Sequence, residues 1–147
     1  MDVIFDSAIF IRGLFDVRIN YEKIFSIPEN TIFKMPTFVY VEVIQPRKDV
    51  AKELERNIVV QELYRVNSVQ DLKIIHPTKR TFEIYKELQL FRSGKHLKSK
   101  SKQHFTIGTI DMWIASICFE NNCHLFTVDK DFEKFTPFFP VTNVSIS

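Results

Sequence analysis

Short apolar runs alternate along the chain with segments in which apolar residues recur at helical spacing. A short run that is apolar throughout is typical of a strand buried on both faces of a sheet. Strands are therefore predicted at Val3–Phe5, Thr31–Met35, Leu72–Ile75 and His124–Val128. The residues from Phe138 to Val141 and from Val144 to Ile146 are expected to close the chain in extended form.

Helices are predicted between these strands. Their expected starts are Ser7 as an N-cap, Thr37 as an N-cap after Pro36, residue 47, Pro77-Thr78 and Thr109. Their expected apolar faces are Ile9, Phe10 and Leu14; Val50, Leu54 and Ile58; Phe82, Tyr85, Leu88 and Phe91; and Ile110, Ile114 and Ile117. The third helix is expected over residues 47–65, the fourth ends before Ser93-Gly94, and the last ends near Glu120. Strands that alternate with helices predict an α/β fold with a central parallel sheet and helices on both faces.

Length and composition limit the class of protein. The 147 residues suffice for one core and are too few for two, so a single domain is expected. With 45% hydrophobic and 26% charged residues, the chain has the composition of a globular protein rather than a disordered one. No segment approaches the roughly 18 uninterrupted apolar residues of a membrane span. The first residues also lack the basic start of a secretory signal, so a cytoplasmic location is expected.

Cysteine and histidine offer little chemistry. Cys118 and Cys123 are too few for a disulfide framework, and no spacing of Cys and His supplies four zinc ligands. We expect both cysteines to be small core residues. The histidines show no paired spacing and are expected to be structural or surface residues: His76, His96, His104 and His124.

Positive charge is concentrated in one part of the chain. Residues 92–104, which we call the basic segment, contain five cationic side chains and no acid: Arg92, Lys95, Lys98, Lys100 and Lys102. Because the whole chain carries only +2, the remainder is mildly acidic. Such a distribution indicates a polyanionic partner that is attracted to one place. A solvated surface loop is the alternative that the sequence leaves open.

Four carboxylates are expected at one edge of the sheet. Asp6 and Asp129 each follow an apolar strand. Asp111 starts a helix after a loop that contains glycine, and Glu42 begins a helix after a strand. Taken alone, Asp6 and Asp111 are more simply explained as helix-cap or first-turn acids, and Asp129 as a residue that opens a turn. Together in one cleft they would repel one another and raise their pKa values unless a cation neutralised them, and hard oxygen ligands suit Mg²⁺ or Mn²⁺.

Both ends of the chain resemble a known family. Ile4-Phe5-Asp6-Ser7 and the run from Asp111 to Phe132, which contains Thr127-Val-Asp-Lys-Asp-Phe, look like the two signature ends of PIN-domain ribonucleases. This family includes the VapC toxins of VapBC toxin–antitoxin pairs. The likeness follows the whole chain in order and length, although the middle third carries only Glu42 as a marker. It implies a single PIN-like nuclease domain over residues 1–147.

The resemblance also implies roles for individual residues. By position, the acidic quartet that binds one or two divalent ions corresponds to Asp6, Glu42, Asp111 and Asp129. Ser7 and Thr127 match hydroxyl residues that support the quartet, and Asp131 matches a less constant acid. One departure is Ala8, because family members often have Asn at that position.

The function implied by the resemblance is metal-dependent hydrolysis of RNA phosphodiester bonds, most simply by a VapC-like toxin. The implied cofactor is Mg²⁺ or Mn²⁺, and the implied partners are RNA and an antitoxin protein, with a homodimer left open. The basic segment is expected to hold RNA phosphates beside the acids. Two alternatives remain: an RNA-processing PIN nuclease without an antitoxin, and a catalytically weak RNA-binding or scaffold PIN domain, which Ala8 makes more plausible. Trp113 is expected to pack between helices rather than to stack on a base.

Overall fold

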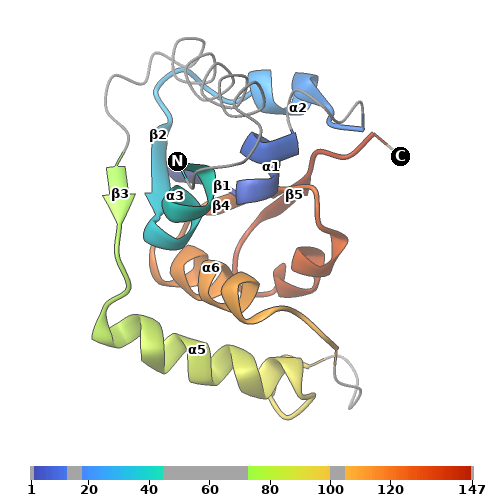
Figure 1. The fold of residues 1–147 in the computed structure, drawn as a ribbon. Helices are drawn as coiled ribbons and strands as arrows, with labels where there is room; N and C mark the ends of the chain where they lie inside the picture. The colour runs from blue at the N-terminus through green and yellow to red at the C-terminus, as the bar shows by residue number, and fades with distance from the viewer. Residues whose placement is uncertain (1, 13–17, 45–72, 100–104, 147) are drawn as a thin grey trace.

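A computed structural model of the protein describes residues 2–12, 18–44, 73–99 and 105–146. Their strands are β1 (Asp2–Phe5), β2 (Ile32–Pro36), β3 (Lys73–Ile75), β4 (His124–Thr127) and β5 (Val141–Asn143). The five strands form one sheet in the order β3-β2-β1-β4-β5, and every neighbouring pair is parallel. The predicted α/β fold with a central parallel sheet is confirmed (Figure 1).

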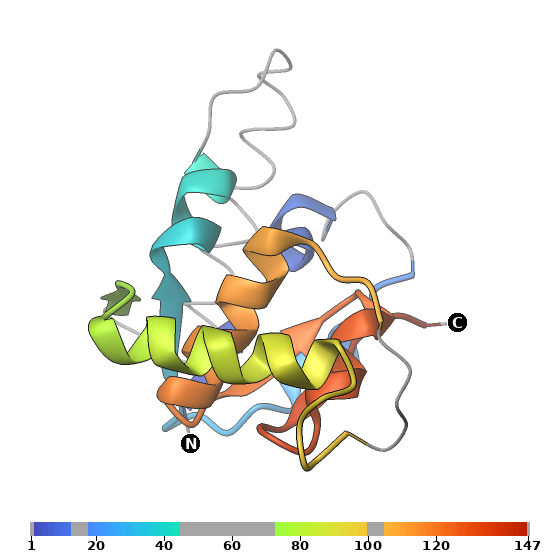
Figure 2. The same cartoon turned by 90° about the horizontal axis from the view of Figure 1, so that it is seen from below.

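Helices cover the sheet on both sides. They are α1 (Ser7–Arg12), α2 (Tyr21–Phe25), α3 (Thr37–Ile44), α5 (Lys79–Arg92), α6 (Thr109–Glu120) and the 3₁₀ helix η1 (Lys130–Phe135). Figure 1 shows α2 on one side of the sheet and α6 with α5 on the other. From below, α5 crosses in front of α6 and the strands lie behind them (Figure 2). None of the helices in the described ranges is long and apolar enough to cross a membrane.

The central strands are buried on both faces, as their uninterrupted apolar runs predict. Side chains alternate along a strand, so Phe5, Phe33 and Phe126 share one face while Ile4 and Leu125 occupy the other. The Phe5 ring lies 5.2 Å from Phe33 and 5.6 Å from Phe126, measured between ring centroids. All five residues are buried. The rings packed together on one face and the aliphatic side chains on the other fix the relative positions of β1, β2 and β4.

The strand order places β1 at the point where the chain reverses its direction across the sheet. From β1 the chain moves to β2 on one side, and it later returns to β4 on the other side. In open parallel sheets a crevice forms at such a point, outside the carboxyl ends of the strands. Phe5 is paired with Phe126, and the Asp6 N–H donates to the Phe126 carbonyl at 3.0 Å. Asp6 is therefore held at the end of β1, directly beside β4.

Two of the predicted helix caps are the first residues of their helices instead. Helix α1 begins at Ser7 and α3 begins at Thr37. The Thr37 hydroxyl donates to the Ile75 carbonyl at 3.0 Å, so it ties α3 to β3 rather than capping its own helix. Glu42 was expected to begin its helix, but it lies in the second turn of α3.

Several predicted apolar faces are wrong in part. Phe82 is 56% exposed and Ile84 is buried in its place, because burial along α5 follows the 3.6-residue period rather than a strict spacing of three. Ile110 is 44% exposed, whereas Ile114 and Ile117 are fully buried as predicted. The predictions for the helix over 47–65, for Leu14 and for Leu72 lie outside the described residues.

The extended ending is predicted from Phe138, which is too early: its later part contains β5 and a bridge at Ser145, but its start does not. Residues 136–138 form a turn after η1, and the Phe138 N–H donates to the Phe135 carbonyl at 2.8 Å. Phe132 and Phe135 are fully buried, and their spacing of three matches the three residues per turn of a 3₁₀ helix. The short helices α2 and η1 were not predicted.

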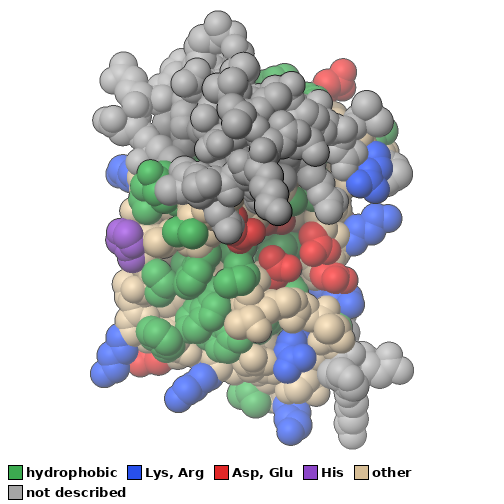
Figure 3. Space-filling model, viewed as in Figure 1, with side chains coloured by type: hydrophobic (Ala, Val, Ile, Leu, Met, Phe, Trp, Pro, Cys, Tyr) green, Lys and Arg blue, Asp and Glu red, His purple; other side chains and the backbone are tan. Residues whose placement is uncertain are grey.

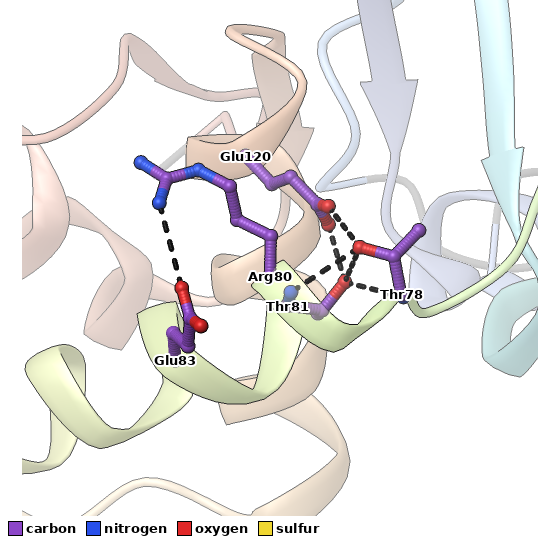
Figure 4. A network of polar contacts seen from close by, with 5 residues as sticks. All are labelled: Thr78, Arg80, Thr81, Glu83 and Glu120. Atoms are coloured by element: carbon purple, nitrogen blue, oxygen red, sulfur yellow. Dashed lines mark hydrogen bonds and ion pairs between the residues drawn. The ribbon is translucent and has the colours of Figure 1, made fainter.

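A network of hydroxyl and carboxylate groups joins the start of α5 to the end of α6 (Figure 4). Thr78 and Thr81 form a capping box at the N-terminus of α5. Both hydroxyls also donate to the carboxylate of Glu120, the last residue of α6. The negative charge lies at the positive end of the α5 dipole, which is the favourable arrangement. These hydrogen bonds therefore hold the N-terminus of α5 against the C-terminus of α6.

Replacing Glu120 with glutamine should lower the free energy of unfolding by about 1 to 2 kcal/mol, because two hydrogen bonds to a charged acceptor are weakened. Chemical denaturation measures this loss. The matched control is Glu83→Gln, which removes an exposed ion pair with Arg80 in the same network and should change the stability by less than about 0.5 kcal/mol. Equal effects of the two substitutions would show that Glu120 does not link the helices.

Candidate functional site: an acidic pocket at the ends of β1 and β4

A pocket of about 480 Å³ opens outside the carboxyl ends of β1 and β4. Its lining residues are Asp6, Ser7, Ala8, Arg18, Ile19, Asp111, Val128, Asp129, Lys130 and Ser145. Three of the four predicted acids are thus brought to one cavity from three separate elements of the fold. Figure 3 shows acidic side chains gathered near the middle of this face, with hydrophobic side chains beside them.

Asp6 is the most deeply buried of these acids, with only 4% of the residue exposed. The Thr127 hydroxyl donates to Asp6 Oδ2 at 2.9 Å. Burial raises the pKa of Asp6, and the negative charges of Glu42 and Asp129 raise it further, whereas hydrogen bonds from Thr127 and from the Ser7 backbone lower it. Burial first, and then the neighbouring carboxylates, therefore disfavour the ionised form of Asp6.

Glu42 does not line the cavity, but its carboxylate contacts Ser7, which does. The Ser7 hydroxyl lies 3.2 Å from Glu42 Oε2 and 3.4 Å from Asp6 Oδ1. Its single proton can serve only one of these acceptors at a time. The hydroxyl thus stands between two carboxylates, and the predicted quartet is completed from α3.

Asp111 shows most clearly that the acids act on one another. It lies in the first turn of α6, where the positive end of the helix dipole favours a carboxylate. Nevertheless its pKa is raised from 3.8 to about 7, first by burial and then by the charges of the other acids. In order of effect these are Asp6, Asp129, Glu42 and Asp131. The five carboxyl groups therefore share one electrostatic environment.

Asp129 is held by the turn that leaves β4. Its Oδ1 accepts the Asp131 N–H at 2.9 Å, which caps η1, and its own N–H donates to the Thr127 hydroxyl at 3.0 Å. Thr127 therefore accepts from one acid residue and donates to another. Asp131 lies outside the pocket lining, and its carboxylate is 3.9 Å from the Lys134 ammonium. Both hydroxyl residues expected to support the acids are in contact with them.

The chemistry of these donors fits a divalent metal ion. The carboxylates supply hard oxygen atoms, and their mutual repulsion is the electrostatic strain that a bound cation neutralises. Within the described ranges, no three side chains of the metal-binding types lie close enough together to ligate one ion. The acids surround the pocket rather than converging on a single point.

Two cations that the sequence did not single out line the pocket, Arg18 and Lys130. The described part of the basic segment does not line it: Lys98 lies 4.9 Å from the centre of the Phe138 ring, and Arg92 donates to Gln89 at 2.8 Å. Lys95 is exposed, and Lys100, Lys102 and His104 lie outside the described residues. RNA binding by this segment stays a prediction. The sequence held one indication that Lys130 reaches the pocket, namely its place directly after Asp129.

The remaining candidates are part of the scaffold. Trp113 packs between helices as expected, with its ring 4.2 Å from Tyr85, 5.0 Å from Phe82 and 6.2 Å from Phe38. Cys118 and Cys123 are buried free thiols. Burial raises the pKa of Cys123 to about 11 and that of Cys118 well above its usual value, so neither is a ready nucleophile.

The described histidines each have a local partner. His76 lies 2.6 Å from the Thr37 hydroxyl, and His96 lies 3.1 Å from a Glu87 carboxylate oxygen. His124 contacts the Thr142 hydroxyl at 2.7 Å, and burial lowers its pKa. None of the three lines the acidic pocket.

Comparison with known proteins identifies one matching family model and several solved structures with the same fold. The family model described as PIN domain matches residues 3–136. No curated protein sequence matches the chain. The fold is similar to that of VapBC2 from Rickettsia felis bound to a DNA fragment from its promoter, with a TM-score of 0.66, 18% identity and coverage of 97% of this chain and 98% of the other.

Two further solved structures have the same fold. VapBC-1 from nontypeable Haemophilus influenzae gives a TM-score of 0.62 at 18% identity, and the match covers 97% of this chain and 98% of that one. VapBC-5 from Mycobacterium tuberculosis, described as a member of the VapBC family of toxin-antitoxin systems, gives 0.58 at 14% identity with 98% of both chains covered. At these identities the likeness concerns the fold.

Asp111→Asn should stabilise the protein at about pH 8 without divalent ions, by about 1 to 2 kcal/mol, which allows for partial exposure of the carboxylate. In the native state the carboxyl titrates near pH 7, and in the unfolded state near its ordinary 3.8. The free energy of unfolding of the parent protein therefore falls as the pH rises between these values. The gain in the variant should shrink towards pH 4.

Chemical denaturation at several pH values measures this difference. Glu133→Gln is the control, because Glu133 is exposed on η1 and outside the pocket. A gain in Asp111→Asn that does not change with pH, or one that Glu133→Gln reproduces, would contradict the proposed repulsion.

Proposed function

Because this chain belongs to the PIN domain family, we propose that it is a metal-dependent endoribonuclease and acts as the toxin of a toxin–antitoxin pair. The observation that carries the proposal is that Asp6, Asp111 and Asp129 line one pocket, where burial and the charges of neighbouring acids raise the pKa of Asp111 to about 7. Carboxyl groups in such an environment favour a cation that restores their ionised form. The pocket beside them is open to a substrate.

Asp6, Asp111 and Asp129 line the pocket that the ion would enter, and Glu42 contacts Ser7 of the same lining. In the described ranges no three of these side chains meet around one point, so a bound ion would draw the carboxylates together. When bound, Mg²⁺ or Mn²⁺ would polarise the phosphodiester and favour attack by water. The scaffold contributes orientation: Thr127 fixes the Asp6 carboxylate, and the cap of η1 fixes the Asp129 carboxylate. Ser7 separates Glu42 from Asp6 and offers either of them a proton to accept in a hydrogen bond.

The toxin assignment is supported by the three solved structures named above, each of which is described as VapBC. We therefore propose that an antitoxin protein binds this chain. Co-purification of a small protein encoded beside the gene, with loss of RNA cleavage in the complex, would support this part. Cleavage that the co-expressed neighbouring protein leaves unchanged would favour an RNA-processing nuclease.

Ala8 favours a second candidate, a catalytically weak RNA-binding PIN domain. It places a methyl group in the pocket lining, where the resemblance leads us to expect the amide of an asparagine. An apolar wall removes one polar contact to a substrate or to a bound water. This candidate binds RNA but does not cleave it at a useful rate.

The purified protein should cleave single-stranded RNA in the presence of Mn²⁺, and EDTA should abolish cleavage. Asp111→Asn should reduce the rate by at least about 100-fold, because it removes one ligand charge at nearly constant volume. The exposed Glu133→Gln variant should retain activity, and thermal unfolding should show that both variants are folded.

Gel analysis of end-labelled RNA provides the measurement. RNA binding without cleavage under any divalent ion would favour the weak, RNA-binding candidate. Cleavage that persists in EDTA or in Asp111→Asn would contradict the assigned role of the acids.

A further inference from the structure

The acidic pocket carries a cation next to its acids. Among the residues that the structure describes, only Arg18 and Lys130 bring positive charge to its lining. Lys130 directly follows Asp129, so an ammonium group and a carboxylate enter the same cavity from adjacent residues. The binding partner of the Lys130 side chain therefore has to be identified.

The backbone of Lys130 is held firmly in place. Lys130 is the first residue of η1, and the Asp129 carboxylate caps this helix by accepting the Asp131 N–H at 2.9 Å. Farther along η1, Phe132 and Phe135 are fully buried and anchor the helix in the core. The Lys130 side chain itself is exposed. Lys130 thus combines a fixed backbone in the pocket lining with an exposed side chain.

Lys130 makes no ion pair with any residue in the described ranges, although three carboxylates share its pocket. The other lysine of η1 differs in this respect. Lys134 lies 3.9 Å from Asp131 Oδ1, and its ammonium group lies 4.8 Å from the centre of the Phe105 ring. The charge of Lys134 is thus paired within the protein, whereas Lys130 lines the cavity without an ion-pair partner in the described ranges.

A nucleic-acid strand that enters this pocket meets the negative charges of Asp6, Asp111 and Asp129. One divalent ion neutralises only part of them, and the phosphodiester adds a charge of its own. A lysine at the rim lowers this repulsion, and its compact ammonium group suits a phosphate oxygen. A cation at the position of Lys130 therefore favours a substrate phosphate in this pocket.

We propose that the Lys130 ammonium group binds a non-bridging oxygen of an RNA phosphate in the pocket and so positions the strand beside Asp129. This assignment rests on the proposed ribonuclease function and names a substrate-binding residue for it. It differs from a role of the basic segment, whose described cations lie outside the pocket lining. It also predicts a contribution to binding that does not require a metal ion.

The test is the affinity for a short, fluorescently labelled single-stranded RNA of mixed sequence, measured by anisotropy in EDTA at several salt concentrations. Lys130→Gln should weaken binding by about 3- to 10-fold at low salt and flatten the slope of log affinity against log salt by about 0.7, the value for one phosphate contact. Lys134→Gln, which removes the same charge from the same helix, should bind like the parent protein. Lys130→Arg should restore most of the affinity.

In the cleavage reaction with Mn²⁺, Lys130→Gln should raise KM more than it lowers kcat. The reason is that the lost contact forms with the bound substrate in the ground state as well as in the transition state. Equal losses in Lys130→Gln and Lys134→Gln would overturn the proposal, because they would reflect net charge alone. An unchanged affinity and salt slope in Lys130→Gln, with a parent protein that binds and cleaves RNA, would also overturn it and leave the ribonuclease function intact. A parent protein that neither binds nor cleaves RNA would refute that function and this inference with it.

Discussion

Repulsion among carboxylates held at the ends of β1 and β4 is the constraint on which the site depends. Asp6 is nearly inaccessible to solvent, and Asp111 has a pKa near 7 because burial and four neighbouring acids disfavour its ionised form. Carboxyl groups with perturbed pKa values are concentrated at functional sites, so this unfavourable arrangement indicates a functional site. In the proposed function a divalent cation would relieve this repulsion, and the same groups would then present the cation to a substrate in the adjoining pocket.

The scaffold keeps these acids together against their repulsion. The parallel pairing of β1 with β4 places Asp6 beside Thr127, whose hydroxyl accepts from the Asp129 N–H and donates to Asp6. Stacked phenylalanines on one face of the sheet fix these strands. On the other side, Glu120 joins the end of α6 to the capped start of α5, so that Asp111 projects from a helix whose C-terminal end is held.

Much of this arrangement could be predicted from local patterns. Uninterrupted apolar runs identify β1 and β4, and the acids that follow them, Asp6 and Asp129, lie where the end of a parallel strand must place them. The exposure of Ile110 could not be predicted, because spacing defines a helical face but the neighbouring elements decide how much of it is covered. Phe82 was misplaced because a spacing of three was used where burial along α5 follows the 3.6-residue period. Lys130 and Arg18 were missed for a related reason: no periodic pattern marks a cation that reaches a pocket through the fold.

Calorimetric titration with Mn²⁺ at about pH 6, in buffers of different ionisation enthalpy, tests the central claim most directly. An aspartate with an ordinary pKa is already ionised at this pH and releases no proton when it binds a metal. If the carboxyl groups share one pocket as described, binding should release about one proton per ion, mainly from Asp111, and Asp111→Asn should lose most of this release together with affinity. Binding of equal strength in the variant, or binding without proton release in the parent protein, would contradict the account.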